Sequence, residues 1–577
     1  MLYAFASRGE KLTKGCAEPQ SAAVIVVTCI RILLNSLTMQ RAITADLPRS
    51  GWIPRITSRA RIEAPTRIEW TGALATAILL ILSFPNLNLP FLAWLALLPL
   101  LAAVAYRPSR LRAFVLGWAA GSIFFYGSCY WLTYSMIHYG GLPSWVAYLL
   151  LAPIAATVGL FPALFGLLLA NALKRFGQTA LLLAPVFWCA TEWLRLEVTG
   201  QLWNAIGYSQ AEFLNGLLIQ PARWGGVYLI GFLIVSVNGA LAFALVRRKS
   251  KDLAIALAII TAVMVFIALA ARGNQQTTSV SSPNLYVVAL QPNVPMTMIK
   301  TVTEMDELRD RHFLMTTNAL KLLPSNTVPR LVVWPESPMN FTYASDRRFQ
   351  ELVTTFAREN HTSLLFNSLE PAAGEGSYNS ALLINEDGRL ISQYDKIRLL
   401  PFGEYVPLPT WLGGSLISGL VGDFTAGTHY TLMPVGDHRV GVFICIESAY
   451  PSIAKKLTSE GADVLINISN DGYLGPTAVM HQHLANAIFR SVENGRPLLR
   501  VTNSGLSAKI KSDGAIEDIT KGFQPDIRIW TVTSGSSTRT FYTAHGDIFV
   551  ELCTVMTVLI LVATFYRRRS SQLLDER

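Results

Sequence analysis

Two kinds of hydrophobic pattern divide this chain into parts. The first is a series of long apolar runs that begins at Thr71, with short polar loops between them. About 20 apolar residues in a helix cross the hydrocarbon core of a bilayer, and several runs approach that length. They predict a seven-helix transmembrane domain over residues 70–272 and a C-terminal transmembrane helix over residues 547–566. The predicted spans are 71–84, 89–106, 113–136, 145–173, 181–193, 226–246, 253–271 and 548–566.

The second pattern follows a polar, Ser/Thr/Gln-rich segment at residues 273–283, which we interpret as a linker. Short β-branched runs alternate there with helical stretches, which is typical of buried strands in a layered α/β domain. The pattern predicts such a domain over residues 284–540. Its clearest strands are expected at 285–290, 331–334, 364–367, 440–444 and 464–468, and its clearest helices at 305–323 and 481–493.

The positions of basic residues predict which side of the membrane each loop faces. Lys and Arg follow the second, fourth, sixth and eighth spans, whereas the other short loops have almost none. Because cytoplasmic loops are enriched in these residues, both termini are expected in the cytoplasm, including a basic tail at 567–577. The α/β domain is then extracytoplasmic, and it is periplasmic if the cell has two membranes. The basic groups are Arg107, Arg110 and Arg112, Lys174 and Arg175, and the clusters at 247–251 and 567–569.

The first 69 residues have two interpretations. Residues 22–34 are apolar but few, and Arg31 interrupts them. They fit a signal-like segment or an additional membrane anchor. The alternative, which we favour, is a poorly ordered cytoplasmic extension from a start site assigned too early, with Met39 or a later codon as the beginning.

Composition supports the membrane interpretation. Of 577 residues, 51% are hydrophobic and 15% charged, and the mean hydropathy of +0.37 is too high for an ordinary soluble protein. The net charge of +10 does not indicate a nucleic-acid partner, because much of it flanks apolar runs. The six cysteines form no CxxC or Cys/His array, so the cysteines do not predict a zinc site. Cys129, Cys189 and Cys553 lie in apolar runs and are expected to be buried packing residues.

The candidate chemistry lies in three segments of the α/β domain, each expected to be a strand that ends in a turn. They contain Glu336, Lys396 and Cys445, and Cys445 is the only cysteine between residues 272 and 547. A thiol needs a base before it becomes a good nucleophile, and Glu336 is the candidate base. Lys396 and the backbone N–H of Ile446 are candidates to stabilise an oxyanion. The residues alone also fit a core cysteine, a turn carboxylate and a solvated lysine.

The local sequences are more specific. VVWPES, YDKIRLLPFGEYVP and VGVFICIES, in this order, resemble the three catalytic motifs of the nitrilase superfamily. QPNV, NISNDGYLG and HQH…ENGRPLLRVTNSG extend the resemblance. With SFPNLNLPFLAWLALLPLL and LWNAIGYSQ…GGVYLIGFL in the membrane part, residues 71–569 resemble the apolipoprotein N-acyltransferase family. The resemblance implies an αββα sandwich for the α/β domain.

The resemblance also implies an activity and the residues that perform it. The expected triad is Glu336 as general base, Lys396 as oxyanion stabiliser and Cys445 as nucleophile, with Glu404 and Glu447 in support. Members of this family take an acyl chain from a phospholipid, typically phosphatidylethanolamine, and hold it as a thioester. They then pass it to the N-terminal amine of a diacylglyceryl-cysteine in an apolipoprotein, without metal or cofactor.

Two positions depart from the family pattern. Ile446 stands where a tyrosine usually follows the nucleophile, and Lys300 stands where an aromatic residue is frequent. Both are expected to shape the acyl or headgroup pocket and therefore substrate preference.

Three further features have open interpretations. Residues 408–424 are apolar with interspersed glycines and follow Glu404 directly, so they fit a lid, a membrane-dipping arm or a buried loop. His481 and His483 form an HxH that fits a structural role at a helix start better than a metal site. The last feature is a set of charges near the extracytoplasmic end of the fifth span, which fit a headgroup contact or an interface marker: Glu192, Arg195 and Glu197.

Two other functions are considered for the whole chain. A membrane-anchored amidase or nitrile hydrolase would use the same triad with water as acceptor, but one anchor would suffice for it. A scaffold or transporter with an inactive domain is disfavoured by the complete triad and by the scarcity of intramembrane charges.

Overall fold

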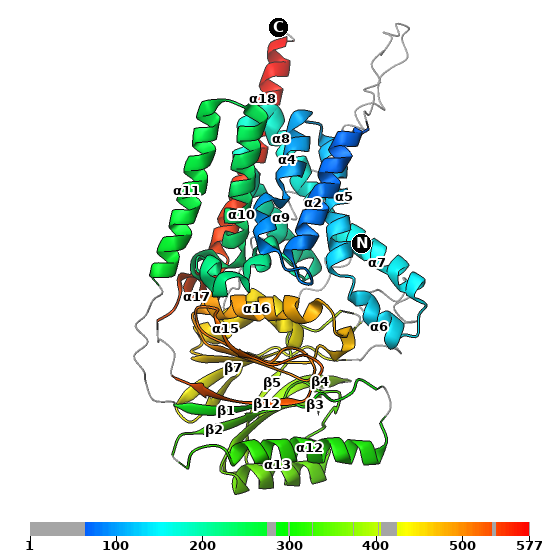
Figure 1. Cartoon of the computed structure of the whole chain (residues 1–577), viewed down its shortest axis with the longest axis vertical. Coiled ribbons are helices and arrows are strands. Elements are labelled where there is room, and N and C mark those ends of the chain that lie inside the picture. The colour runs from blue at the N-terminus through cyan, green and yellow to red at the C-terminus, as the bar shows by residue number, and fades with distance from the viewer. Residues whose placement is uncertain are drawn as a thin grey trace, which may run out of the picture. The chain divides into compact units, whose positions relative to one another are not determined.

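A computed structural model of the chain describes residues 64–273, 284–297, 300–325, 327–372, 374, 376–401, 403–405, 424–533 and 538–575. From Ala64 onward the chain forms one compact unit. This unit has a bundle of apolar helices at one end and two stacked sheets at the other (Figure 1). Of the predicted N-terminal extension, residues 1–63 lie outside the described residues, and the first helix of the bundle already begins at Arg67.

The apolar runs form helices, and each predicted span overlaps at least one of them. Among the described residues, three helical stretches are long and apolar enough to cross a membrane, and a fourth is counted if α5 and α6, bent by 50°, form one span. Those three are Ser144–Thr199, Ala222–Arg247 and Ser250–Arg272, and shorter apolar helices cover Pro90–Tyr106 and Ile548–Thr564. The helices are α2 (Arg67–Ser83), α3 (Ala93–Ala96), α4 (Leu98–Tyr106), α5 (Arg110–Ser128), α6 (Leu132–His138), α7 (Ser144–Val158), α8 (Leu160–Phe176), α9 (Ala184–Thr199), α10 (Ala222–Arg247), α11 (Ser250–Arg272) and α18 (Ile548–Asp575).

The predicted span 145–173 is divided into two helices, α7 and α8, which meet at Gly159. A Cβ atom on Gly159 would lie 2.3 Å from the hydroxyl of Ser122 on α5. Glycine is therefore needed at this junction because α5 packs directly against it.

The α/β part contains two six-stranded sheets, with strand orders β12-β1-β2-β3-β4-β5 and β11-β10-β9-β8-β7-β6. The pairs β1–β2, β2–β3, β7–β8 and β8–β9 are parallel, and the outer pairs are antiparallel. All five predicted strands are confirmed within a few residues. The strands are β1 (Leu285–Gln291), β2 (Arg330–Val333), β3 (Ser363–Pro371), β4 (Ser377–Ile384), β5 (Leu390–Asp395), β6 (Leu432–Val435), β7 (His438–Ile444), β8 (Val464–Ser469), β9 (Leu498–Thr502), β10 (Ala508–Ile510), β11 (Ile516–Ile519) and β12 (Asp526–Val532).

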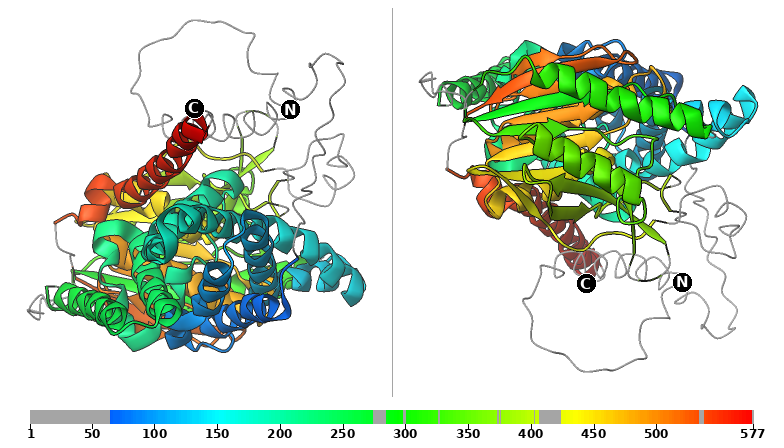
Figure 2. Two further views of the ribbon diagram at one scale, coloured as in Figure 1. Left: turned by 90° about the horizontal axis from the view of Figure 1, so that it is seen from above. Right: turned by 90° about the horizontal axis from the view of Figure 1, so that it is seen from below.

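The two sheets pack face to face, and helices cover their outer faces. Along β1, Leu285, Val287 and Ala289 point into the core between the sheets. Tyr286, Val288 and Leu290 point the other way, since side chains alternate along a strand. That outer face is covered by α12 (Val302–Leu320) and α13 (Arg347–Glu359), which Figure 2 shows lying across the sheet from below. The result is the predicted αββα sandwich.

The outer face of the second sheet carries α15 (Pro451–Ser459) and α16 (Val479–Asn494). Helix α16 also contacts α10 of the apolar bundle and α17 (Phe541–His545). Almost every residue of α16 is buried, because the sheet covers one side and the bundle the other (Figure 1). Helix α16 is therefore the layer that joins the two parts of the molecule.

Candidate active site

Cys445 stands on a sharp turn at the end of a buried strand. Strand β7 ends at Ile444, and Cys445 begins a short 3₁₀ turn. Its φ of +53° lies in the left-handed region, which costs a non-glycine residue about 1–3 kcal/mol unless its surroundings hold it there. The Cys445 carbonyl accepts hydrogen bonds from Nε2 of His483 at 2.9 Å and Nδ2 of Asn467 at 3.4 Å. These two contacts hold the strained backbone in place.

The structure brings Lys396 together with both candidate carboxylates. Lys396 follows β5 directly, and its Nζ atom lies 2.9 Å from Oε1 of Glu404 and 3.7 Å from Oε1 of Glu336. Nδ2 of Asn379, on the neighbouring strand β4, donates to the same two oxygens at 2.8 and 2.9 Å. One ammonium and one amide therefore hold two carboxylates that would otherwise repel each other.

The charges of this cluster act on the thiol. Burial, followed by the charge of Glu336, raises the pKa of Cys445 to about 12, against the opposing effect of Lys396. Burial lowers the pKa of Lys396, but Glu404 and Glu336 more than offset this, so its pKa is raised and the ammonium stays charged. At neutral pH the resting site therefore holds a protonated thiol beside a charged lysine. A thiol in this state needs a base during its attack.

Glu447 joins the nucleophile turn to the lysine segment. It is fully buried, and its Oε1 accepts the backbone N–H groups of Ile397 and Arg398 at 2.8 and 3.0 Å. Its Oε2 accepts the N–H of Ile444 at 2.7 Å, and the Tyr394 hydroxyl donates to both oxygens. Glu447 thus ties the turn that carries Cys445 to the segment that carries Lys396.

Sequence reasoning missed several residues that organise the site. Asn379 lies in the unremarkable segment SYNS, and nothing local indicates its contact with two carboxylates. Asp471 and Arg500 form a buried ion pair at 2.9 Å, and Arg500 holds the pKa of Asp471 at about 2 although burial alone would raise it. Asp471 also contacts Nδ1 of His483 at 2.8 Å. Only the resemblance of NISNDGYLG to known motifs pointed to this segment.

The two histidines of the HxH have different partners. Nδ1 of His481 lies 3.1 Å from the carboxylate of Glu212 in the membrane part, whereas His483 contacts Asp471 and the Cys445 carbonyl. Each therefore serves a hydrogen-bonding role at the start of α16, in line with the structural interpretation. Of the two departures, Ile446 is buried and Lys300 donates to the Thr297 carbonyl. The apolar segment 408–424 lies outside the described residues apart from Phe424.

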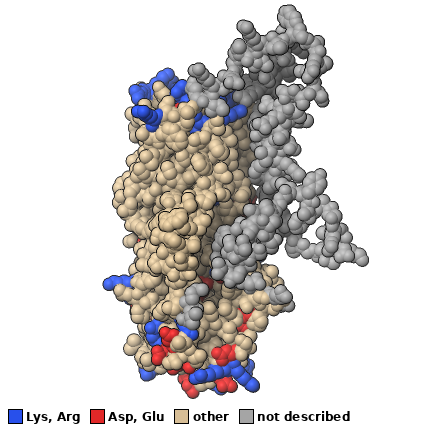
Figure 3. Space-filling view, turned by 90° about the vertical axis from the view of Figure 1, so that its right-hand side faces the viewer, with Lys and Arg blue, Asp and Glu red and all other residues tan. Residues whose placement is uncertain are grey.

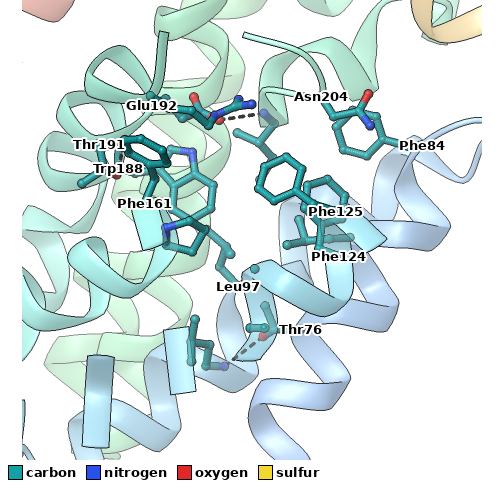
Figure 4. A pocket seen from close by; sticks show the side chains of 17 residues that line it. Thr76, Phe84, Leu97, Phe124, Phe125, Phe161, Trp188, Thr191, Glu192 and Asn204 are labelled. Atoms are coloured by element: carbon teal, nitrogen blue, oxygen red, sulfur yellow. Dashed lines mark hydrogen bonds between the residues drawn. The ribbon is translucent and has the colours of Figure 1, made fainter. Parts of the chain in front are cut away.

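In the membrane part, Glu192 and Arg195 are buried in α9 and support the loop that follows it. Oε1 of Glu192 accepts the N–H of Ile206 at 2.9 Å, and Arg195 donates to the Trp203 carbonyl at 2.6 Å. Both line a small, mostly apolar pocket, shown in Figure 4. Glu192 and Arg195 thus form hydrogen bonds that stabilise the loop after α9, whereas Glu197 is exposed.

Two family models match the chain. The one described as apolipoprotein N-acyltransferase N-terminal domain matches residues 76–240, and the one described as carbon-nitrogen hydrolase matches residues 316–535. The apolipoprotein N-acyltransferase of Geobacter metallireducens is 31% identical over 518 residues, which is 88% of this chain and 97% of that protein. The protein of the same name from Shewanella oneidensis is 30% identical over 470 residues, 77% of this chain and 85% of that protein. A solved carbon-nitrogen hydrolase from Helicobacter pylori is 17% identical, with a TM-score of 0.32 over 43% of this chain and 88% of its own.

Proposed function

This chain belongs to the apolipoprotein N-acyltransferase family, and from that membership we propose that it moves an acyl chain from a phospholipid to the N-terminal amine of an apolipoprotein. The acceptor is the α-amino group of a diacylglyceryl-cysteine, and phosphatidylethanolamine is the expected donor. The observation that carries the proposal is the placement of Cys445 on a strained turn, within reach of the charge of a lysine that is held between two carboxylates.

In the first half-reaction, Cys445 takes the acyl chain. Glu336 accepts the thiol proton as Sγ attacks the ester carbonyl of the phospholipid, because a thiol with a pKa of about 12 supplies almost no free thiolate. The S–C bond forms and the carbonyl oxygen becomes an oxyanion, which Lys396 and the N–H of Ile446 stabilise. The ester C–O bond then breaks, and Glu336 returns its proton to the departing lysophospholipid oxygen.

In the second half-reaction, the lipoprotein amine attacks the thioester. The N–C bond forms, the C–S bond breaks, and one amine proton passes through Glu336 to the sulfur of Cys445. The same oxyanion donors serve both steps, because each step passes through a tetrahedral intermediate at the same carbon. Glu336 alternates between base and acid, so no net proton is consumed.

Glu404 and Glu447 support these steps from fixed positions. Glu404 holds Lys396 at 2.9 Å and accepts the backbone N–H of Leu400 with its other oxygen at 2.7 Å. Its contact orients the ammonium and keeps it charged. Glu447 ties the Cys445 turn to the Lys396 segment, as described above.

We propose an extracytoplasmic catalytic domain on a multi-pass protein of the inner membrane. Lys and Arg side chains gather at the end of the helical bundle remote from the sheets (Figure 3), where α4, α8 and α10 end. Under the positive-inside rule that end is cytoplasmic. The αββα sandwich then faces the periplasm, and substrates anchored in the outer leaflet reach it by diffusion in the membrane plane.

The proposal is tested with purified full-length protein in nanodiscs that contain phosphatidylethanolamine. Mass spectrometry should find an acyl adduct on Cys445, and a diacylglyceryl peptide with a free N-terminus should remove it and become acylated. Cys445→Ser should abolish adduct and product. Cys553→Ser, at a buried cysteine of α18, is the matched control and should retain both. Absence of the adduct would contradict the proposal, and loss of the adduct to water alone would indicate a hydrolase.

A further inference from the structure

His483 is a buried histidine that contacts the nucleophile's backbone instead of its thiol. It lies on α16 and is 3% exposed. Its Nε2 atom is 2.9 Å from the carbonyl oxygen of Cys445. A carbonyl oxygen can only accept a hydrogen bond, so this contact requires a hydrogen on Nε2, and the contact of Nδ1 with the Asp471 carboxylate requires one on Nδ1 as well.

The Cys445 carbonyl belongs to the same peptide unit as the N–H of Ile446. A trans peptide is planar, and its C=O and N–H bonds point in opposite directions within that plane. A hydrogen bond that fixes the carbonyl of Cys445 therefore also fixes the direction of the Ile446 N–H. The φ of +53° at Cys445 shows that the residue which carries this peptide unit has a strained backbone.

We propose that His483 is a positioning residue for acyl transfer, which holds the peptide plane between Cys445 and Ile446 so that the Ile446 N–H stays directed at the developing oxyanion. This inference rests on the proposed function, since it needs an acyl carbonyl that becomes an oxyanion at Cys445. His483 acts through the peptide and does not contact the substrate. Its effect is therefore expected on the rate of the chemical step and not on substrate binding.

An ion pair between Asp471, just after β8, and Arg500 on β9 holds the His483 ring. Nδ1 faces Oδ1 of Asp471 at 2.8 Å, just after β8, and Arg500 on β9 binds both oxygens of Asp471 at 2.9 and 3.1 Å. The ring of Trp203 from the membrane part lies 5.5 Å away, centroid to centroid. The ring can therefore rotate only by breaking the contact with a buried carboxylate that is itself paired.

The preceding residue connects this arrangement to the membrane part. Oε1 of Gln482 accepts the indole N–H groups of Trp131 and Trp203 at 2.9 and 2.8 Å. Its Nε2 donates to the carbonyls of Pro85 and Ser128 at 3.2 and 3.0 Å. Four hydrogen bonds to the bundle thus fix the position of α16 along its axis and its rotation about that axis, at the residue next to His483. The membrane part fixes the position from which His483 reaches the nucleophile turn.

Two substitutions separate the two contacts of the ring. An asparagine amide can occupy the place of Nδ1, so His483→Asn keeps a donor near Asp471 and loses the contact with the Cys445 carbonyl. A glutamine amide reaches the place of Nε2, so His483→Gln keeps the carbonyl contact. His481→Gln is the matched control, because it changes a histidine two residues away on the same helix whose carboxylate partner is Glu212.

Each full-length variant is assayed in nanodiscs over a range of phosphatidylethanolamine contents, so that the maximal rate of Cys445 acylation and the half-saturating lipid content are obtained separately. His483→Asn should lower the maximal rate about 10- to 100-fold, somewhat less than the loss of an oxyanion donor itself, with an unchanged half-saturating content. His483→Gln and His481→Gln should remain within about threefold of the wild type.

Alkylation of Cys445 by iodoacetamide distinguishes positioning from a general structural defect. Alkylation displaces iodide and forms no oxyanion, so His483→Asn should alkylate at nearly the wild-type rate while its acylation is slow. Three results would overturn the inference. His483→Asn could lose acylation and alkylation in parallel, or it could acylate at the wild-type rate. The third is that His483→Gln acylates as slowly as His483→Asn. Failure of the wild type to form any acyl adduct would instead overturn the proposed function, and this inference with it.

Discussion

The ammonium of Lys396 lies 2.9 Å from the carboxylate of Glu404. Glu336 is 3.7 Å from the same nitrogen, and Asn379 bridges the two carboxylates. The lysine is therefore held mainly by Glu404, which leaves Glu336 less constrained and 16% exposed at its side chain. This division of contacts fits a structural role for Glu404 and a proton-transfer role for Glu336.

Glu336→Gln should separate acylation from simple alkylation. The charge of Glu336 helps to raise the pKa of Cys445 to about 12, so its removal should lower that pKa and increase the thiolate fraction. At pH 8, iodoacetamide should then react faster, by roughly threefold for each half-unit fall in pKa. Acylation by phospholipid should nevertheless fall by about 10²- to 10⁴-fold, because the variant lacks the proposed general base.

Site-specific mass spectrometry of the Cys445 peptide measures both rates for the Glu336 variant. Glu370→Gln is a suitable control, since Glu370 is a buried carboxylate on β3 bonded to Ser368. If Glu336→Gln slowed alkylation and acylation equally, the carboxylate would be acting on the fold of the site and not as a base.

Glu447→Ala should destabilise the protein. The substitution leaves three backbone N–H groups and the Tyr394 hydroxyl without their acceptor in a fully buried place. An unpaired buried polar group costs about 1–3 kcal/mol, so a total loss of roughly 3 kcal/mol or more is expected. Thermal unfolding in detergent measures it, and Glu460→Ala on the surface is the control. An unchanged melting temperature would show that water replaces these contacts.

Gln482→Leu should weaken the junction between the bundle and the sandwich. Two indole N–H groups and two carbonyls lose their partner. Each of these groups that water does not reach costs about 1–3 kcal/mol of folding free energy. Limited proteolysis should cut the variant faster than the wild type, and its melting temperature should fall. Equal protection in both proteins would mean that other contacts of α16 carry the junction.

The His481–Glu212 pair should make stability depend on pH. Its hydrogen bond to Glu212 raises the pKa of His481 above the ordinary 6.5. The stabilisation is therefore fully present below pH 6.5 and is lost as the pH rises through the folded value. Because the His481 side chain is 44% exposed, only about 0.2–1 kcal/mol is expected. The melting temperature of the wild type, relative to that of Glu212→Gln, should fall between pH 6 and pH 9; a constant difference would contradict this.

Some of the site follows from local sequence and some does not. The strands that end before Glu336 and Cys445 were predicted correctly, because a buried strand needs a continuous apolar run whatever surrounds it. The contacts of Asn379 and His483 were not predicted. Asn379 meets Glu336 across 43 positions of the chain, and His483 meets Cys445 across 38. No local pattern records which distant side chains a sheet brings together.

By itself, the sequence determined the division into apolar bundle and α/β domain, because hydrophobic periodicity is a property of short segments. Its motifs, through their resemblance to a known family, indicated the αββα architecture and the candidate residues Glu336, Lys396 and Cys445. Only the tertiary structure decided which carboxylate holds Lys396, how Glu447 ties two strand ends together, and that α16 joins the bundle to the nucleophile turn. Those relationships depend on sheet order and on the packing of one helix between two parts of the molecule. They exist only once segments far apart in the chain have been brought within hydrogen-bonding distance.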